Sequence, residues 1–226
     1  MNLVLRGHIR DTFEKPDLYE LVKCLYQLFP GLVIYVHTWN VFANNLSWRH
    51  INADNTVVTE ETVTNYFKDM SHLIKHIIVD DDQAIAHVGK TDGTISRTPM
   101  PLLGWKNYWF GQHRVLQHMK DAGVHQATTL VNMRFDILTL ADTYDFHKEN
   151  VVTEFISLHA DQQFTRNVFV RDYAFTGMDN IYVGNLGTMA PLVEYFVYNM
   201  DRLIEAHPDL YHQEHLVKYV NDLLFP

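Results

Sequence analysis

Short apolar runs that alternate with amphipathic helical stretches constrain the fold of this chain more than any other feature. Four runs predict buried strands, because they are short, rich in branched apolar residues and bounded by polar or turn residues. They lie at residues 3–5, 32–36, 74–79 and 129–138, with helical spacing of apolar residues after Pro16, after Thr59 and from about Trp105 to Ala122. This order predicts an α/β fold with a mostly parallel central sheet flanked by helices.

The start and end signals of the helices are also visible. Asp17 with Glu20 resembles a capping box, Thr59 is a second helix cap, and Gly123 is suited to end the long helix. In the second half, short apolar runs at 155–158, 168–170 and 181–183 are expected to add mixed strands. We expect a helix that begins at Pro191 and a final helix over 215–224.

Composition excludes several classes of protein. The formal net charge of −9, without a Lys/Arg cluster, argues against a nucleic-acid partner. The single cysteine excludes an internal disulfide and a cysteine metal centre. No apolar stretch approaches the roughly 18 residues of a membrane span, and the N-terminus lacks the apolar run of a signal peptide. We therefore expect a soluble cytoplasmic protein, built as one unit over residues 1–226.

All four predicted strands are followed by charged, imidazole or aromatic side chains. Because ligands bind beyond the carboxyl ends of the strands in open parallel sheets, these positions predict a common polar site. The candidates are Arg6, His8 and Arg10 after the first strand, His37 and Trp39 at the second, Asp80 and Asp82 at the third, and Arg134 and Asp136 in the fourth.

The Arg134-Phe135-Asp136 insert interrupts an otherwise apolar run. A buried unpaired charge costs several kcal/mol or more, so the two charges either satisfy each other or face a ligand. If the strand alternates, Arg134 and Asp136 share a face. One interpretation gives Asp136 a metal ion or a sugar hydroxyl and Arg134 a phosphate. The other is a structural ion pair, and the position at the ligand edge favours the first.

The other strand ends have similar pairs of interpretations. Carboxylates at 80–82 suit Mg²⁺ or Mn²⁺ or a ribose, but they also suit an acidic turn or a helix cap. Arg6, His8 and Arg10 suit phosphate oxygens or a base, but the arginines could equally pair with Asp11 on the surface. Neither a dinucleotide-binding glycine motif nor a P-loop is present.

Tryptophans with polar neighbours form a further group of candidates. Trp39, Trp48 with Arg49, and Trp105 are suited to stack on sugar or base rings, although plain core packing is the alternative for each. Lys106 lies near the expected start of a helix, where backbone amides attract anions, and could help to hold a diphosphate.

Asp179 and Glu214 are the candidate proton acceptors of the second half. Asp179 precedes a short apolar run and is suited to a base or acceptor contact, with a simple Asx turn as the alternative. Glu214 lies between His212 and His215, but the order differs from that of zinc proteases. We therefore interpret Glu214 as a polar group of an acceptor pocket.

The motifs R-G-H-x-R at 6–10, H-T-W-N at 37–40 and R-F-D at 134–136, in this order, resemble those of GT-A glycosyltransferases. These are small nucleotide-sugar-binding proteins of bacteria and of large viruses or phages. The resemblance covers about the first 185 residues. It implies a GT-A-like domain with a nucleotide-sugar half over about 1–136 and an acceptor half with C-terminal helices over 137–226. For a viral member, the expected location is the host cytoplasm.

The resemblance implies transfer of a sugar from a UDP- or GDP-sugar to a hydroxyl of a glycan or another acceptor, assisted by Mn²⁺ or Mg²⁺. Asp136 would be the metal-binding carboxylate, and Asp179 or Glu214 would accept the acceptor proton. The family's D-x-D is R-x-D here, so Arg134 would supply part of the cation's charge. The nucleotide sugar would contact Arg6, His8, Arg10, His37, Trp39, Asp80, Asp82, Trp105, Lys106 and Arg134.

Two alternatives come from other classes of function. One is a nucleotide- or carbohydrate-binding protein of the same fold without turnover. The other, weaker one is a metal-dependent phosphohydrolase that uses the carboxylates at 80–82, which would require two or more carboxylates to converge on one metal centre.

Overall fold

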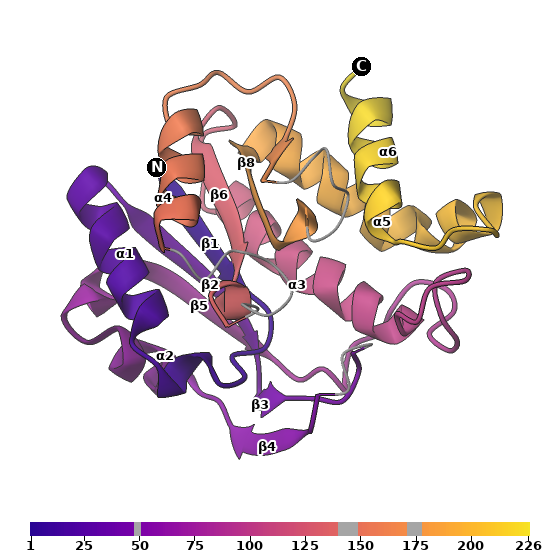
Figure 1. The fold of residues 1–226 in the computed structure, drawn as a ribbon, viewed down its shortest axis with the longest axis horizontal. Coiled ribbons are helices and arrows are strands. Elements are labelled where there is room, and N and C mark those ends of the chain that lie inside the picture. The colour runs from indigo at the N-terminus through magenta and orange to yellow at the C-terminus, as the bar shows by residue number, and fades with distance from the viewer. Residues whose placement is uncertain (48–50, 140–148, 171–177) are drawn as a thin grey trace.

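A six-stranded sheet with strand order β5-β2-β1-β6-β8-β7 organises the chain (Figure 1). The computed structural model describes residues 1–47, 51–139, 149–170 and 178–226. A separate two-stranded sheet pairs β3 with β4. The strands are β1 Asn2–Arg6, β2 Val33–Trp39, β3 Val41–Ala43, β4 Asp54–Val57, β5 Ile74–Asp80, β6 Thr129–Arg134, β7 Val168–Phe169 and β8 Ile181–Asn185.

The main sheet is mixed, which corrects the prediction of a mostly parallel one. Strands β5, β2, β1 and β6 run parallel, whereas β8 is antiparallel to both β6 and β7. The reason is the point at which the chain enters β8. Its first residue, Ile181, pairs with Met133 near the end of β6, so β8 starts at the edge where the parallel strands finish. The start of β8 therefore contributes to the same edge of the sheet as the ends of β1 and β6.

Helices cover both faces of the sheet (Figure 1). Because strand side chains alternate, Leu3 and Leu5 pack in the core with α1, α2 and α4, and Val4 packs in the core with α3, α5 and α6. Arg6 follows the phase of Val4 and lies on the α3 face. The helices are α1 Asp17–Leu28, α2 Glu60–Phe67, α3 Leu102–Asp121, α4 Glu149–His159, α5 Leu186–Ala206 and α6 Glu214–Leu224.

Helix α3 lies unusually close to β2. A Cβ atom on Gly111 would lie 2.5 Å from Nδ1 of His37, which is fully buried. A side chain at position 111 would therefore push α3 away from the sheet. In the part of the chain that the structure describes, no helix is long and apolar enough to cross a membrane.

Two of the helix signals are confirmed. Thr59 caps α2, and Thr62 completes a capping box. Gly123, with φ of 74°, follows α3. The prediction of a capping box at Asp17 is wrong, because Pro16 occupies the cap position and makes no side-chain cap bond. Asp17 is instead the first helical residue, where its negative charge interacts favourably with the positive end of the helix dipole.

Two predictions in the second half are also wrong. The run at 155–158 is part of α4, because Val152 and Ile156 are buried one helical turn apart. Helix α5 begins at Leu186 and not at Pro191, because Asn185 accepts a hydrogen bond from the Thr188 amide and caps the helix earlier. The expected strands within 168–170 and 181–183 are confirmed as β7 and β8.

Candidate functional site

A cleft opens at the sheet edge where β1 and β6 end. Its empty volume is about 810 Å³, a figure that includes open solvent at the mouth. It is lined by residues of β1, β2, β6, α3 and α6, of the loops after β1 and β3, and of the 3-10 helix that precedes β8. Among the sequence-predicted residues, the cleft brings together Arg6, His8, Arg10, Trp39, Trp105, Arg134, Asp179 and Glu214.

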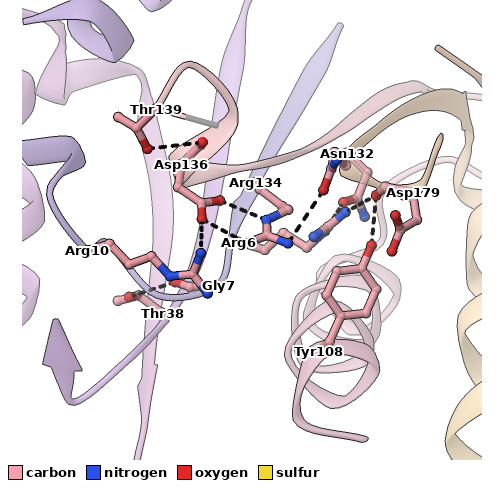
Figure 2. A network of polar contacts seen from close by, with 11 residues as sticks. Arg6, Gly7, Arg10, Thr38, Tyr108, Asn132, Arg134, Asp136, Thr139 and Asp179 are labelled. Carbon is pink, nitrogen blue, oxygen red and sulfur yellow. Dashed lines mark hydrogen bonds and ion pairs between the residues drawn. The ribbon is translucent and has the colours of Figure 1, made fainter. Parts of the chain in front are cut away.

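Two arginines meet at one buried carboxylate beside the cleft (Figure 2). Asp136 lies in the short 3-10 helix Phe135–Ile137 and is 2% exposed. Arg134 binds both of its oxygens, Nε to Oδ1 and Nη2 to Oδ2, each at 2.7 Å, and Nη1 of Arg10 also donates to Oδ2. Burial opposes the Arg134 charge, but the Asp136 carboxylate outweighs it and raises the Arg134 pKa. The structural ion pair is thus formed, and Arg134 also lines the cleft.

The loop after β1 is shaped to return Arg10 to Asp136. Gly7 adopts a φ of 96°, which a residue with a side chain rarely tolerates, and Arg10 adopts a φ of 55°. The Thr38 hydroxyl donates to the Gly7 carbonyl at 3.1 Å, and the Arg10 amide donates to the Phe42 carbonyl at 2.8 Å. These bonds to β2 and β3 hold the loop in place.

The surroundings of Asp136 do not fit a divalent cation. Both of its oxygens accept hydrogen bonds from guanidinium groups, so a metal bound there would lie next to two positive charges. Among the described residues, no group of three or more His, Cys, Asp or Glu side chains is placed to hold a metal. The Mn²⁺ or Mg²⁺ of the resemblance stays a prediction, and Asp136 is better suited to position two arginines.

Arg6 forms the floor of the cleft, next to Arg134 in the sheet. The two residues are register partners across β1 and β6, and His37 is the partner of Arg6 on β2. The Arg6 Nη2 group donates to the Asp179 carbonyl at 2.6 Å, and Nε donates to Oδ1 of Asn132. Its guanidinium lies over the Tyr108 ring, 4.4 Å from the centroid.

Two carboxylates line the same cleft. Asp179 lies in the 3-10 helix Met178–Asn180 that leads into β8, and Glu214 is the first residue of α6. The Tyr108 hydroxyl donates to the Asp179 carbonyl at 2.7 Å, and burial raises the pKa of Tyr108 well above its ordinary value. The cleft therefore has cationic side chains at the strand ends and carboxylates from the second half of the chain.

Asp80 and Asp82 lie behind the cleft lining, each with its own partners. Nε2 of His8 lies 3.5 Å from Asp82 Oδ2, and this interaction is the largest cause that lowers the Asp82 pKa to about 2. Asp80 lies 3.2 Å from His37 Nε2 and 3.0 Å from Arg114 Nε. The phosphohydrolase alternative requires the two carboxylates to converge on one metal centre. They do not, because each of them contacts a different histidine.

The aromatic and lysine candidates are less accessible to a ligand than their residue types suggested. Trp39 and Trp105 are each 2% exposed, so their ring faces are largely covered. Lys106 does not line the cleft, because its Nζ pairs with Asp201 at 2.7 Å. The residue lines a separate pocket between α3 and α5. Trp48 and Arg49 lie outside the described residues.

The sequence places Asn180 beside Asp179 as a candidate base or acceptor contact and Tyr108 within the aromatic run 105–109, but it predicts a contact with Arg6 or Arg134 for neither. Tyr108 is three residues after Trp105 and so shares its side of α3, whereas Lys106 points elsewhere. This helical phase could have identified Tyr108 from the sequence. Asn180 follows Asp179 directly, and its role depends on the antiparallel start of β8, for which the sequence contains no local signal.

Several buried histidines make the stability of the fold depend on pH. Burial lowers the pKa of His37 and of His8, so both stay neutral in the folded chain at a pH where the unfolded chain is already protonated. The same direction holds for His76, His87, His113 and His215. A depressed histidine pKa means that stability is lost as the pH falls below the ordinary value of 6.5.

Urea unfolding midpoints measured from about pH 8 to 5 should therefore fall steadily below about pH 6.5. His37→Asn should reduce this slope, whereas His125→Asn, at an exposed position, should leave it unchanged. A midpoint that is constant over this range would contradict the assignment of neutral buried histidines.

Comparison of the chain with protein-family models, with curated proteins and with solved structures finds no match, so the resemblance to GT-A glycosyltransferases stays a prediction.

Proposed function

We propose that this protein is a glycosyltransferase that moves a sugar from a nucleotide diphosphate to a hydroxyl acceptor. The observation that carries the proposal is one cleft at a sheet edge that combines arginines on two adjacent strand ends with two carboxylates. A diphosphate leaving group needs positive charge, and arginine is suited to bind phosphate oxygens in pairs. Arg10 and Arg134 retain 18% and 19% side-chain exposure, so a ligand can reach them.

In the proposed reaction, the acceptor oxygen forms a bond to the anomeric carbon as the bond from that carbon to the phosphate oxygen breaks. The bonding electrons leave with the diphosphate, whose charge Arg10 and Arg134 stabilise. Asp179 or Glu214 takes the proton of the acceptor hydroxyl. Because Asp136 does not fit a metal ion, we assign the stabilisation of the leaving group to the arginines.

A panel of UDP-, GDP-, CMP- and dTDP-sugars tests this proposal by thermal shift. A ligand at 100 times its dissociation constant adds about 2.7 kcal/mol of stability. We expect one nucleotide class to stabilise the wild type equally with Mn²⁺ and with EDTA, because the arginines supply the charge. Arg134→Gln should abolish the shift. Arg114→Gln is the matched control, since Arg114 pairs with Asp80 outside the cleft lining.

The outcomes separate the functions considered above. Absence of a shift with every nucleotide sugar would refute the glycosyltransferase. A shift with no sugar transfer to any acceptor and no release of nucleotide diphosphate would identify a binding protein. A shift that requires Mn²⁺ would restore the metal-dependent mechanism that the resemblance implies.

A further inference from the structure

Arg6 is a buried cation without an anionic partner among the described residues. It is 1% exposed, yet its hydrogen bonds go to neutral acceptors, the Asn132 side chain and the Asp179 backbone carbonyl. Arg10 and Arg134 differ, because both pair with Asp136. A buried charge that no counter-charge compensates destabilises the fold, so its presence at a cleft indicates a ligand that compensates it.

Further hydrogen-bond donors at the cleft have no acceptor among the described residues. Besides Nη1 of Arg6, they are Nδ2 of Asn180, Nδ2 of Asn107 and Nε1 of Trp105. These residues are 1% to 3% exposed, and all four line the cleft. The orientation of the Asn180 amide is fixed, because its Oδ1 accepts a hydrogen bond from Arg134 at 3.4 Å. Buried donors normally have partners, so four at one cleft point to a ligand group that only accepts.

We propose that Arg6, Trp105, Asn107 and Asn180 form an oxyanion subsite on the floor of the cleft. It adjoins the cluster of Arg10, Asp136 and Arg134 through the hydrogen bond from Arg134 to Asn180, and it takes one anionic oxygen group. A phosphate oxygen and a carboxylate share the chemistry that these donors recognise. The subsite holds whether the protein transfers a sugar or only binds a ligand, so the inference does not depend on the proposed reaction.

Asn132 provides the sharpest test of the subsite. Its side chain is fully buried, accepts the Arg6 Nε hydrogen bond and does not line the cleft. Asn132→Asp keeps the shape of the residue and gives Arg6 a permanent counter-charge. We expect a higher melting temperature and an affinity for anions at least tenfold weaker, because the new carboxylate replaces the anion of the ligand. Asn199→Asp on α5 adds the same charge away from the cleft and is the control.

The probes are inorganic pyrophosphate, UDP, UDP-glucose and UDP-glucuronic acid, measured by calorimetric titration at constant ionic strength. If Asn132→Asp weakens all four, the subsite holds a phosphate oxygen. If it weakens only UDP-glucuronic acid, the subsite holds the sugar carboxylate. Loss of pyrophosphate binding in the variant, with no binding of nucleotides to the wild type, would support the subsite and refute the glycosyltransferase.

Two results would overturn the subsite. One is wild-type affinity of Asn132→Asp for every probe, and the other is no binding of any probe to the wild type. Trp105→Phe provides a second variant if Asn132→Asp does not fold. It removes the Nε1 donor together with part of the ring that packs on Trp109 and Phe196, and it keeps an aromatic ring in the core. Binding should weaken several-fold, and unchanged affinity would contradict the proposal.

Discussion

Asp136→Asn should destabilise the protein by about 3 to 5 kcal/mol, the range for the loss of one partner from a buried ion pair. The carboxylate is 2% exposed and is shared by Arg10 and Arg134. The substitution removes the buried counter-charge that the two adjacent guanidinium groups share, although the shape of the side chain is kept. We expect this loss of stability also above about pH 6.5, where the buried histidines no longer take up protons on unfolding, because both arginines stay charged there.

Chemical denaturation at pH 7 measures this change, and a chain of this size should show a fall in melting temperature of roughly 10 °C. Asp222→Asn is the matched control. Asp222 pairs with Arg166 on the surface, with 46% of its side chain exposed, and its loss should change stability by about 0.5 kcal/mol or less. Equal effects of the two variants would show that Asp136 does not hold the arginines together.

Asp179→Asn should reduce the turnover of sugar transfer by about 10²- to 10⁴-fold, the usual contribution of a general base. The variant keeps the Asp179 backbone carbonyl that accepts hydrogen bonds from Arg6 and Tyr108, so the cleft floor should stay intact. The affinity for the nucleotide sugar should therefore remain that of the wild type. This prediction rests on the proposed function.

The binding affinity distinguishes a proton acceptor from a structural role, because loss of a structural contact would weaken binding of the nucleotide sugar together with turnover. Glu214→Gln is the matched variant at the other carboxylate of the cleft. If Glu214→Gln shows the large loss and Asp179→Asn does not, the base is Glu214, and if neither does, the proposed chemistry is wrong.

The alternation of strands and helices could be predicted from the sequence because it depends on local patterns. The short apolar runs that form β1, β2, β5 and β6 can be recognised in a single sequence. The direction of β8 could not be predicted, because strand direction depends on how the chain returns to the sheet. The direction matters for the site, since the antiparallel entry places Asp179 beside Arg6 and Asn180 beside Arg134.

The same limit explains the mixed result for the candidate residues. Arg6 and Arg134 could be placed at one edge because the ends of parallel strands meet there. Lys106 was misplaced because the phase of α3 turns it toward Asp201, and the position of a helix start does not show this. The partner of Asp80 is His37 on β2 and that of Asp82 is His8 in the loop after β1, and only the tertiary structure brings them together.

Because Arg6 and Arg134 pair across β1 and β6, the sheet fixes the distance between two like charges. Backbone hydrogen bonds, and not side-chain contacts, hold these residues about 4.8 Å apart. All the backbone hydrogen bonds between β1 and β6 therefore act together against the repulsion of the two charges. The length of β1 then matters as much as its composition. One residue gained or lost within this strand would turn Arg6 to the opposite face, into the apolar layer beneath α1 and α4.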